Sequence, residues 1–151
     1  MAIVGKDAKV SLGTNKVVGM GTWSLDGIQI EEFDASEFGD DWKKFEYGMK
    51  DGGSISFNGH YKPEDTTGQQ ALQQANLYNS KLTNLRLYIN NTSYFEPCST
   101  AGWFSPALTT GAPTPAGSSV TITSFNIGMD KSGLGTISFT GKVSGVMVRA
   151  I

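Results

Sequence analysis

Cysteine and histidine are almost missing from this sequence of 151 residues, in which Cys98 and His60 are the single examples of their kinds. One cysteine excludes a disulfide or a cysteine-based zinc site within the chain. One histidine likewise excludes a histidine-rich metal site or a mechanism that pairs two histidines. The simplest expectation is a chain that folds in a reducing cytoplasm.

Long apolar runs, strong net charge and catalytic motifs are missing as well. No segment approaches the roughly 20 apolar residues that span a bilayer, and the first residues lack the layout of a signal peptide. We therefore expect no membrane partner. A formal net charge of −2 gives no support for a protein that binds nucleic acid by neutralising phosphates, although DNA could still pass along its surface. No nucleophile elbow, phosphate loop or zinc-protease motif occurs, so we expect neither an enzyme nor a cofactor.

The composition favours β-structure. The chain has 19 glycines, and 38% of its residues are hydrophobic while 17% are charged. Together with abundant serine and threonine, these values favour short strands joined by turns over a helical bundle. The length suits a single domain covering residues 1–151.

Alternating residues predict several strands. In Ser54–Tyr61 the residues Ile55, Phe57 and Tyr61 share one face and polar residues the other, as in a half-buried strand. Further strands are predicted at 9–12, returning as a hairpin at 16–18, at 84–90, and at 120–127 with a phase change near Ser124. A turn is predicted at 128–133.

Two further stretches of alternating residues predict strands, one uninterrupted and one with a change of phase. Residues 135–148 form the longest alternating run and predict one central strand with Ile137 and Phe139 on its apolar face. In residues 22–31 the apolar phase flips at Asp26 and Gly27, which a β-bulge explains better than a tight turn.

One α-helix is predicted at about residues 66–80. Its apolar stripe would contain Ala71, Ala75, Tyr78 and Leu82, while glutamines cover the remaining surface. Either that glutamine-rich face is solvated or it contacts a neighbour. Thr67 and Gln70 fit a capping box, although Glu64 and Asp65 would also favour the helix N-terminus.

Residues 38–53 form a long connection in which aromatic residues lie among charges of both signs. One interpretation is a solvated loop with aromatics folded back on the core. The other is an intersubunit surface, where aromatics act as buried anchors and charges fix the orientation. The candidate interface residues are Phe38, Asp40, Asp41, Trp42, Lys43, Lys44, Phe45, Tyr47 and Lys50. A second long loop, rich in Gly, Pro and Thr, is predicted at 99–119, with Trp103 and Phe104 fixing its start to the core.

The order of these features resembles the tail tube proteins, or major tail proteins, of long-tailed bacteriophages. The residues that carry the resemblance are GKDAKV at 5–10, TWSL at 22–25, DASEFGD at 34–40, GGSISFNGHY at 52–61, DTTGQ at 65–69 and FTGKVSG at 139–145. The resemblance covers nearly the whole chain except residues 99–119.

This resemblance implies a β-sandwich or barrel-like subunit with one flanking helix that assembles into hexameric rings. Stacked rings would form the conduit for DNA delivery in a virion whose parts are made in the bacterial host cytoplasm. The implied partners are further copies of the chain and other tail proteins, namely the tape measure, terminator, and baseplate or tip proteins, with DNA as non-specific cargo. The connection at 38–53 would reach towards the adjacent ring.

A tube of this kind needs a lumen that DNA does not bind. Small polar and acidic side chains would repel phosphates and offer no platform on which bases stack. The candidate lumen residues are Ser54, Ser56, Asn58, Thr136, Ser138 and Thr140.

Two alternatives remain open at this point. A secretion tube protein resembling the Hcp proteins would share the fold and the ring but carry effectors. A monomeric β-sandwich that binds carbohydrate would instead use Trp23, Trp42 and Trp103 as a platform.

Overall fold

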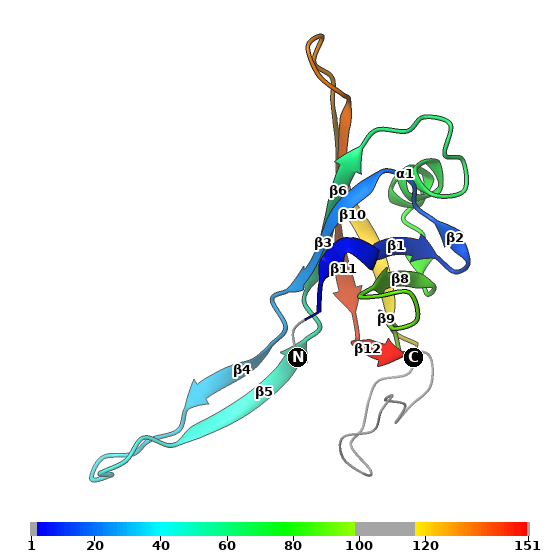
Figure 1. The fold of residues 1–151 in the computed structure, drawn as a ribbon. Helices are drawn as coiled ribbons and strands as arrows, with labels where there is room; N and C mark the ends of the chain where they lie inside the picture. Colours follow the sequence, from blue (N-terminus) through cyan, green and yellow to red (C-terminus); the bar gives the residue numbers. More distant parts are fainter. Residues whose placement is uncertain (1–2, 99–116, 151) are drawn as a thin grey trace.

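The computed structural model describes residues 3–98 and 117–150, which form a sandwich of two antiparallel sheets with a hairpin projecting from it (Figure 1). Sheet A has the strand order β12-β9-β8-β1-β2, and sheet B has the order β3-β6-β11-β10-β7. The predicted mainly β fold with one flanking α-helix is confirmed. Residues 99–116 of the predicted loop, including Trp103 and Phe104, lie outside the described residues.

The strands follow one another along the whole described chain. They are β1 (Lys9–Leu12), β2 (Asn15–Lys16), β3 (Met20–Asp26), β4 (Gln29–Asp34), β5 (Phe45–Asp51), β6 (Ser54–His60), β7 (Lys81–Leu82), β8 (Leu85–Tyr88), β9 (Tyr94–Pro97), β10 (Ser119–Gly128), β11 (Thr136–Ser144) and β12 (Met147–Ala150). A short 3₁₀ turn, η1 (Gly5–Asp7), precedes them, and the helix α1 (Gln69–Leu77) lies between β6 and β7.

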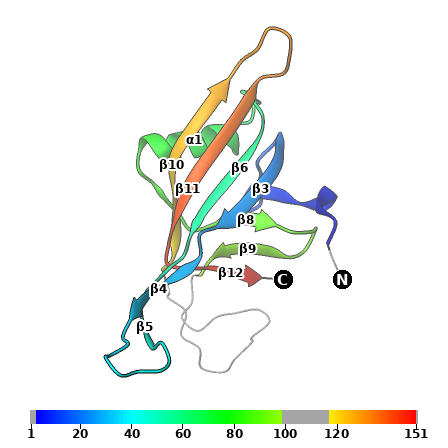
Figure 2. The same ribbon diagram turned by 90° about the vertical axis from the view of Figure 1, so that its left-hand side faces the viewer.

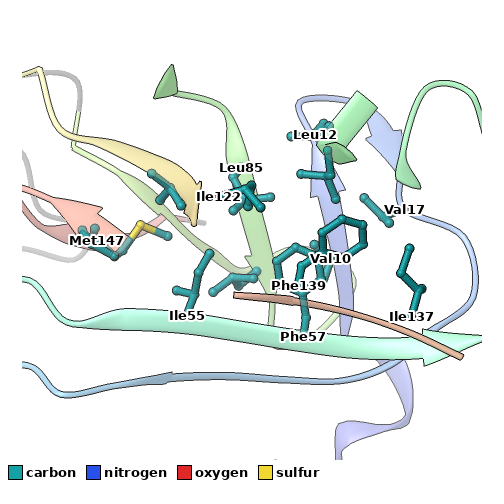
Figure 3. Packing of buried hydrophobic residues seen from close by; sticks show 14 residues of the cluster. Val10, Leu12, Val17, Ile55, Phe57, Leu85, Ile122, Ile137, Phe139 and Met147 are labelled. Carbon is teal, nitrogen blue, oxygen red and sulfur yellow. The ribbon is translucent and has the colours of Figure 1, made fainter. Parts of the chain in front are cut away.

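The core lies between the two sheets, where the alternating apolar side chains meet (Figure 3). Sheet B contributes Phe57 and Phe139, whose rings stack with centroids 5.2 Å apart. Sheet A contributes Val10 and Leu87, both fully buried. β6, β8 and β11 therefore bury the residues of one phase, as the alternation predicts for a sandwich with one solvated face per sheet.

The long alternating run at 135–148 is two strands instead of the predicted single one. β11 is central, as predicted, because it lies between β6 and β10 in sheet B. It ends at Ser144, and Gly145, with a φ of 97°, turns the chain into β12 of sheet A. Met147, in β12, still belongs to the core, because the chain crosses from sheet B to sheet A and the core lies between the two sheets.

The two predicted phase changes have different outcomes. The irregularity in β10 lies between Ile122 and Ser124, as predicted. The break at Asp26 and Gly27 is not a bulge within one strand, because β3 pairs with β6 in sheet B while β4 pairs with β5 outside it. Gly27, with a φ of 76°, marks the point where the chain leaves the sheet.

The helix is shorter than predicted and rotated about its axis. It covers Gln69–Leu77 and buries Gln69, Leu72 and Ala75. The predicted stripe is right for Ala71, Ala75 and Leu82, which pack against the core. It is wrong for Tyr78, which is 78% exposed, and it omits Leu72. Burial of Leu72, a larger apolar side chain than the alanines, decides which face packs on the sandwich.

The helix N-terminus is held by Asp65 and not by a capping box. The Asp65 carboxylate accepts hydrogen bonds from the backbone N–H groups of Gln69 (3.1 Å) and Val18 (2.9 Å). The Gln69 side chain is fully buried; its amide nitrogen donates to the carbonyls of Val18 and His60, and its oxygen accepts from the N–H of Lys62. Gln69, one of the glutamines of the predicted polar face, thus joins the helix to the segments around Val18 and His60.

Candidate assembly surfaces

The projecting hairpin, here called the arm, consists of β4, β5 and the turn between them, residues 29–51. It continues the β3–β6 ladder of sheet B, since the last pair of that ladder is Asp26 with Ser54 and the first pair of the arm is Gln29 with Asp51. The predicted loop at 38–53 is therefore a strand from Phe45 onwards. Figure 1 shows the arm bending away from the sandwich at this joint.

Glycines make the joint between the arm and sheet B possible. Gly53 has a φ of 87°, and a Cβ there would overlap the carbonyl oxygen of Asp26. A Cβ on Gly52 would overlap the carbonyl oxygen of Gly145. Close approach of backbones at such a bend is available only to residues without a side chain.

An ion pair ties the joint to sheet B. The Asp51 carboxylate accepts hydrogen bonds from Lys142 Nζ (2.8 Å) and from the N–H of Gly53 (2.9 Å). These bonds, chiefly that from Lys142, hold the pKa of Asp51 below its ordinary value. The base of the arm is therefore fixed to the sheet that it leaves.

The arm carries seven of the sixteen large apolar side chains that are exposed in the described part of the chain. Among the predicted interface residues, Phe38 is fully exposed and Trp42 is 85% exposed, while Tyr47 and Phe45 are less so. The arm adds apolar residues that sequence reasoning did not select: Ile30, Phe33 and Met49, with Ile28 at the joint. So much exposed apolar surface on one projection marks an interaction site.

The tip of the arm is an ordered turn that its own side chains hold. Ser36 Oγ accepts a hydrogen bond from the N–H of Lys44 (2.8 Å), and the Asp40 carboxylate accepts one from the N–H of Glu37 (2.8 Å). Asp40 also pairs with Lys44 at 3.5 Å. Two of the predicted interface residues, Asp40 and Lys44, therefore shape the tip itself.

Charge is unevenly divided between the arm and the sandwich. The arm contains eight acidic residues and three lysines, a net charge of −5, whereas the whole chain carries −2. The rest of the chain therefore carries +3. The acidic arm and the basic remainder of the chain are therefore opposite in charge, as complementary interaction surfaces are.

The solvated face of sheet B is a continuous layer of small polar side chains. The structure places all six candidate lumen residues on it. The cross-strand rows are Thr22, Asn58 and Ser138; Ser24, Ser56 and Thr140; Asp26, Ser54 and Lys142; and His60 with Thr136. Side chains of this layer bond to one another: the Thr22 hydroxyl donates to the amide oxygen of Asn58 (2.7 Å), and the hydroxyls of Ser24 and Ser56 lie 2.7 Å apart.

Sheet B has two open edges in the described residues. β3 pairs only with β6, and β10 pairs with β7 only at Val120 and Thr121, so its second half has no outer strand partner. An open groove of about 380 Å³ follows the β3 edge and is lined by apolar residues that include Ile3, Met20, Trp23 and Ile89. Open edges of this kind are templates for a strand of another chain.

Sequence reasoning missed one exposed apolar surface, at the far end of the β10–β11 hairpin. There Ile127 is 42%, Met129 is 76% and Leu134 is 71% exposed. Figures 1 and 2 show that this hairpin and the arm project from opposite ends of the sandwich. The signal was present as apolar residues on both sides of the predicted turn at 128–133.

Of the tryptophans, the two in the described residues, Trp23 and Trp42, do not form a common platform of the kind that a carbohydrate-binding module would need. Trp23 is half-buried in sheet B, where its Nε1 donates to the carbonyl of Tyr88 at 3.0 Å and its ring packs edge-on against Phe95. Trp42 lies at the exposed tip of the arm. These two residues serve different parts of the molecule, and Trp103 lies outside the described residues.

Neither helix among residues 3–98 and 117–150 has the length and apolar character to cross a membrane. Within the same residues, no three His, Cys, Asp or Glu side chains gather as a metal site would require.

Comparison with known proteins identifies relatives by fold only. No family model matches the sequence, and no curated protein matches it. Among solved structures, chains from the virion of a native gene transfer agent particle and from the tail of an empty particle with C6 symmetry each give a TM-score of 0.68 at 15% identity. Both alignments cover 99% of this chain and 100% of the other.

A chain from the sheath-tube complex of an extracellular contractile injection system has a TM-score of 0.57 at 13% identity, covering 99% of this chain and 91% of the other. These neighbours belong to particle tails and to contractile injection systems. The resemblance to tail tube proteins is therefore confirmed for the fold.

Proposed function

We propose that this protein is a structural tail tube protein of a bacteriophage, which assembles into stacked hexameric rings that conduct DNA into the host. The observation that carries the proposal is the arm. It places large exposed aromatic side chains on a projection built from the strands of the core sheet, and this occurs on a fold shared with chains of particle tails. A projection with this surface needs a partner to bury it.

Ring formation would use the two open edges of sheet B. The β3 edge of one copy would pair with the second half of β10 in the next, and the groove beside β3 would receive side chains of that strand. Because the two edges differ, the contact is heterologous and generates a ring when the rotation closes. The C6 symmetry of a structural neighbour supports six copies.

The lumen would be lined by the polar face of sheet B. Continued through the ring, this face presents hydroxyl and amide groups that already bond to one another, as between Thr22 and Asn58. The cation of this face, Lys142, is paired with Asp51. Such a wall offers neither free cations for phosphates nor aromatic rings for bases, so DNA would slide along it.

Stacking would use the arm. Phe38, Trp42, Phe45 and Tyr47 would be the buried anchors, and Asp41, Lys43 and Lys50 would set the orientation, with Asp40 and Lys44 shaping the tip. Ring stacks would end on other tail proteins, including the tape measure, terminator, and baseplate or tip proteins. The work is mechanical, without an enzymatic step or a cofactor, in a virion tail assembled in the bacterial host cytoplasm.

A tube of a contractile injection or secretion system is the second candidate. The neighbour in a sheath-tube complex favours it. Such a tube would use the same ring and stacking contacts but carry protein cargo instead of DNA.

The test is electron microscopy of the purified protein over a concentration series, with light scattering in parallel. We expect rings or hollow tubes. Particles that remain monomeric at the highest concentration would contradict self-assembly and favour a monomeric binding module. The genes beside the coding sequence would separate a phage tail from an injection system.

The Trp42→Ala variant tests the arm directly. We expect it to form rings but few tubes, because an exposed aromatic anchor is lost while the folded chain keeps its contacts. A second variant replaces residues 29–50 by Asn-Gly, a two-residue hairpin turn that should close β3 onto β6. Thr92→Ala, at the exposed turn between β8 and β9, is the control and should assemble like the parent. Tubes of normal length from the armless variant would refute the stacking role.

A further inference from the structure

The far end of the β10–β11 hairpin, residues 127–136, is here called the hairpin end. After the arm, it is a second place in the described residues where exposed apolar side chains gather. We propose that the hairpin end of one copy receives the arm of another copy. This inference rests on the proposed function and names the surface against which the arm packs. The arm and the hairpin end project from opposite ends of one sandwich (Figures 1 and 2).

The hairpin end is chemically suited to aromatic anchors. Met129 and Leu134 are both more than two-thirds exposed, and Ile127 is 42% exposed. The Met129 sulfur lies over Gly135, where a Cβ would come within 2.6 Å of it. A methionine adapts its shape to a partner and makes favourable contacts with aromatic rings, which the arm supplies as Phe38 and Trp42.

The hairpin end is ordered before anything binds to it. Asp130 accepts hydrogen bonds from the N–H and the hydroxyl of Ser132, both at 3.1 Å. The N–H of Tyr61 donates to the carbonyl of Gly135 at 2.9 Å and so ties the hairpin to the segment after β6. A preformed surface loses little conformational entropy on binding, which favours association.

A small hollow adjoins the hairpin end. It has a volume of about 190 Å³ and is lined by Tyr61, Lys62, Pro63, Gln70 and Gln73. Lys62 adds a cation there, opposite in sign to the net charge of the arm. The hollow therefore offers room and complementary charge beside the apolar residues of the hairpin.

A second copy is the partner that fits best, because both surfaces belong to every chain. In a stack of rings, each inner copy has one arm and one hairpin end to cover. Two unlike surfaces on opposite ends give a heterologous contact that does not close, which is the geometry of an open-ended filament.

Cross-linking between engineered cysteines tests the contact. Glu37→Cys places a thiol at the arm tip and Lys131→Cys places one at the hairpin end, and both leave the apolar residues intact. The native Cys98 is fully buried, so the background should be low. Assemblies mixed from the two variants are treated with a flexible bis-maleimide, and we expect a product of two 16.1 kDa chains joined at the two engineered positions.

The control mixes Glu37→Cys with Asn91→Cys, which places the second thiol at the exposed turn between β8 and β9. Tubes that cross-link equally well to this control, or not at all at Lys131→Cys, would refute the proposed contact and leave the tube function standing. If neither the parent nor any variant forms rings or tubes, the proposed function fails and this contact fails with it.

A double variant, Met129→Asp with Leu134→Asp, provides the second readout. Rings should persist, because Met129 and Leu134 lie between β10 and β11 and so outside the strand edges proposed for ring formation. The fraction of protein in tubes should fall on the order of tenfold, as expected for loss of central apolar contacts. Tubes as abundant as those of the parent would overturn the proposal.

Discussion

The β3–β6 pair of sheet B and the arm are built from the same two stretches of chain, yet only the β3–β6 pair has a face buried in the core. Along β6, Ile55 and Phe57 are each 1% exposed, whereas along β5 Phe45 and Tyr47 are 38% and 60% exposed. Strand pairing is the same in both, since β4–β5 continues the β3–β6 ladder. The difference is the layer beneath: sheet A covers one face of sheet B, and nothing in the described chain covers the arm.

This contrast explains why the arm points to assembly. A two-stranded hairpin is marginally stable in water and becomes stable when another layer covers its apolar face. The acidic charge of the arm favours solubility of the single copy, while its aromatic residues favour burial. The arm therefore has the composition of a core strand pair, and under the proposed function its second layer comes from another chain.

Truncating one aromatic residue in the core of sheet B and one in the arm should give the largest difference in the free energy of unfolding. Phe139→Ala removes a fully buried ring that stacks on Phe57, and it should lower the free energy of unfolding by about 3–5 kcal/mol. Tyr47→Ala, in the arm, should change it by less than about 0.5 kcal/mol. Urea denaturation of the unassembled protein, followed by tryptophan fluorescence, measures both. Equal losses would mean that the arm has a hidden partner within its own chain.

The joint should give an intermediate effect. Gly52→Ala places a Cβ against the carbonyl of Gly145, so the backbone has to move, at a cost of about 1–3 kcal/mol. Gly133→Ala is the matched control, because nothing lies within 4 Å of its Cβ position. Thermal unfolding of the two variants is the measurement. A neutral Gly52→Ala would show that the arm can leave sheet B at another angle.

The ion pair at the joint should give the smallest effect, visible as pH dependence. The pKa of Asp51 is lowered in the folded chain, chiefly by its bond from Lys142, so its contribution to stability is complete above the ordinary value of 3.8. That contribution is lost as the pH falls below 3.8 through the folded value. We expect Asp51→Asn to unfold more readily than the parent at pH 6 and equally readily at low pH, in urea titrations.

A carboxylate at the arm tip sharpens this test. The pKa of Asp34 is also lowered, by hydrogen bonds with Ser36. Because those bonds lie within the arm, Asp34→Asn should loosen the turn at residues 35–44 without changing the pH dependence of global unfolding. Amide hydrogen exchange of the tip and urea midpoints of the whole chain separate the two effects. A shift of the global midpoint equal to that of Asp51→Asn would contradict the independence of the arm.

The sheets of the sandwich could be predicted from the sequence because one face of each strand is buried there. In β11, burial of Ile137 and Phe139 imposes the alternation that reveals the strand. The arm has the alternation Phe45, Tyr47, Met49, but mixed charges around it favour a loop interpretation. An alternating apolar pattern does not indicate whether the apolar face is buried by the same chain or by another chain.

The helix itself could be predicted, but its full buried face and the layer crossing could not, because tertiary contacts decide them. Gln69 can be buried because its amide donates hydrogen bonds to the carbonyls of Val18 and His60. The residues beside Gln69 in the sequence do not indicate these distant partners. The run through Gly145 keeps its apolar period while the chain changes sheets, so periodicity alone reads it as one strand. The hairpin end was read as a turn because its apolar residues are few.

The continuity of the arm with sheet B has a mechanical consequence. A pull on the tip of the arm is passed along β6, which is held to β11 by seven paired positions from Ser54 to His60. Force directed along paired strands loads these positions together, in shear, instead of opening them one at a time. Tension on the arm is thus borne by β6 and β11, the central strands of sheet B. The direction of the force changes at the joint formed by Gly52 and Gly53.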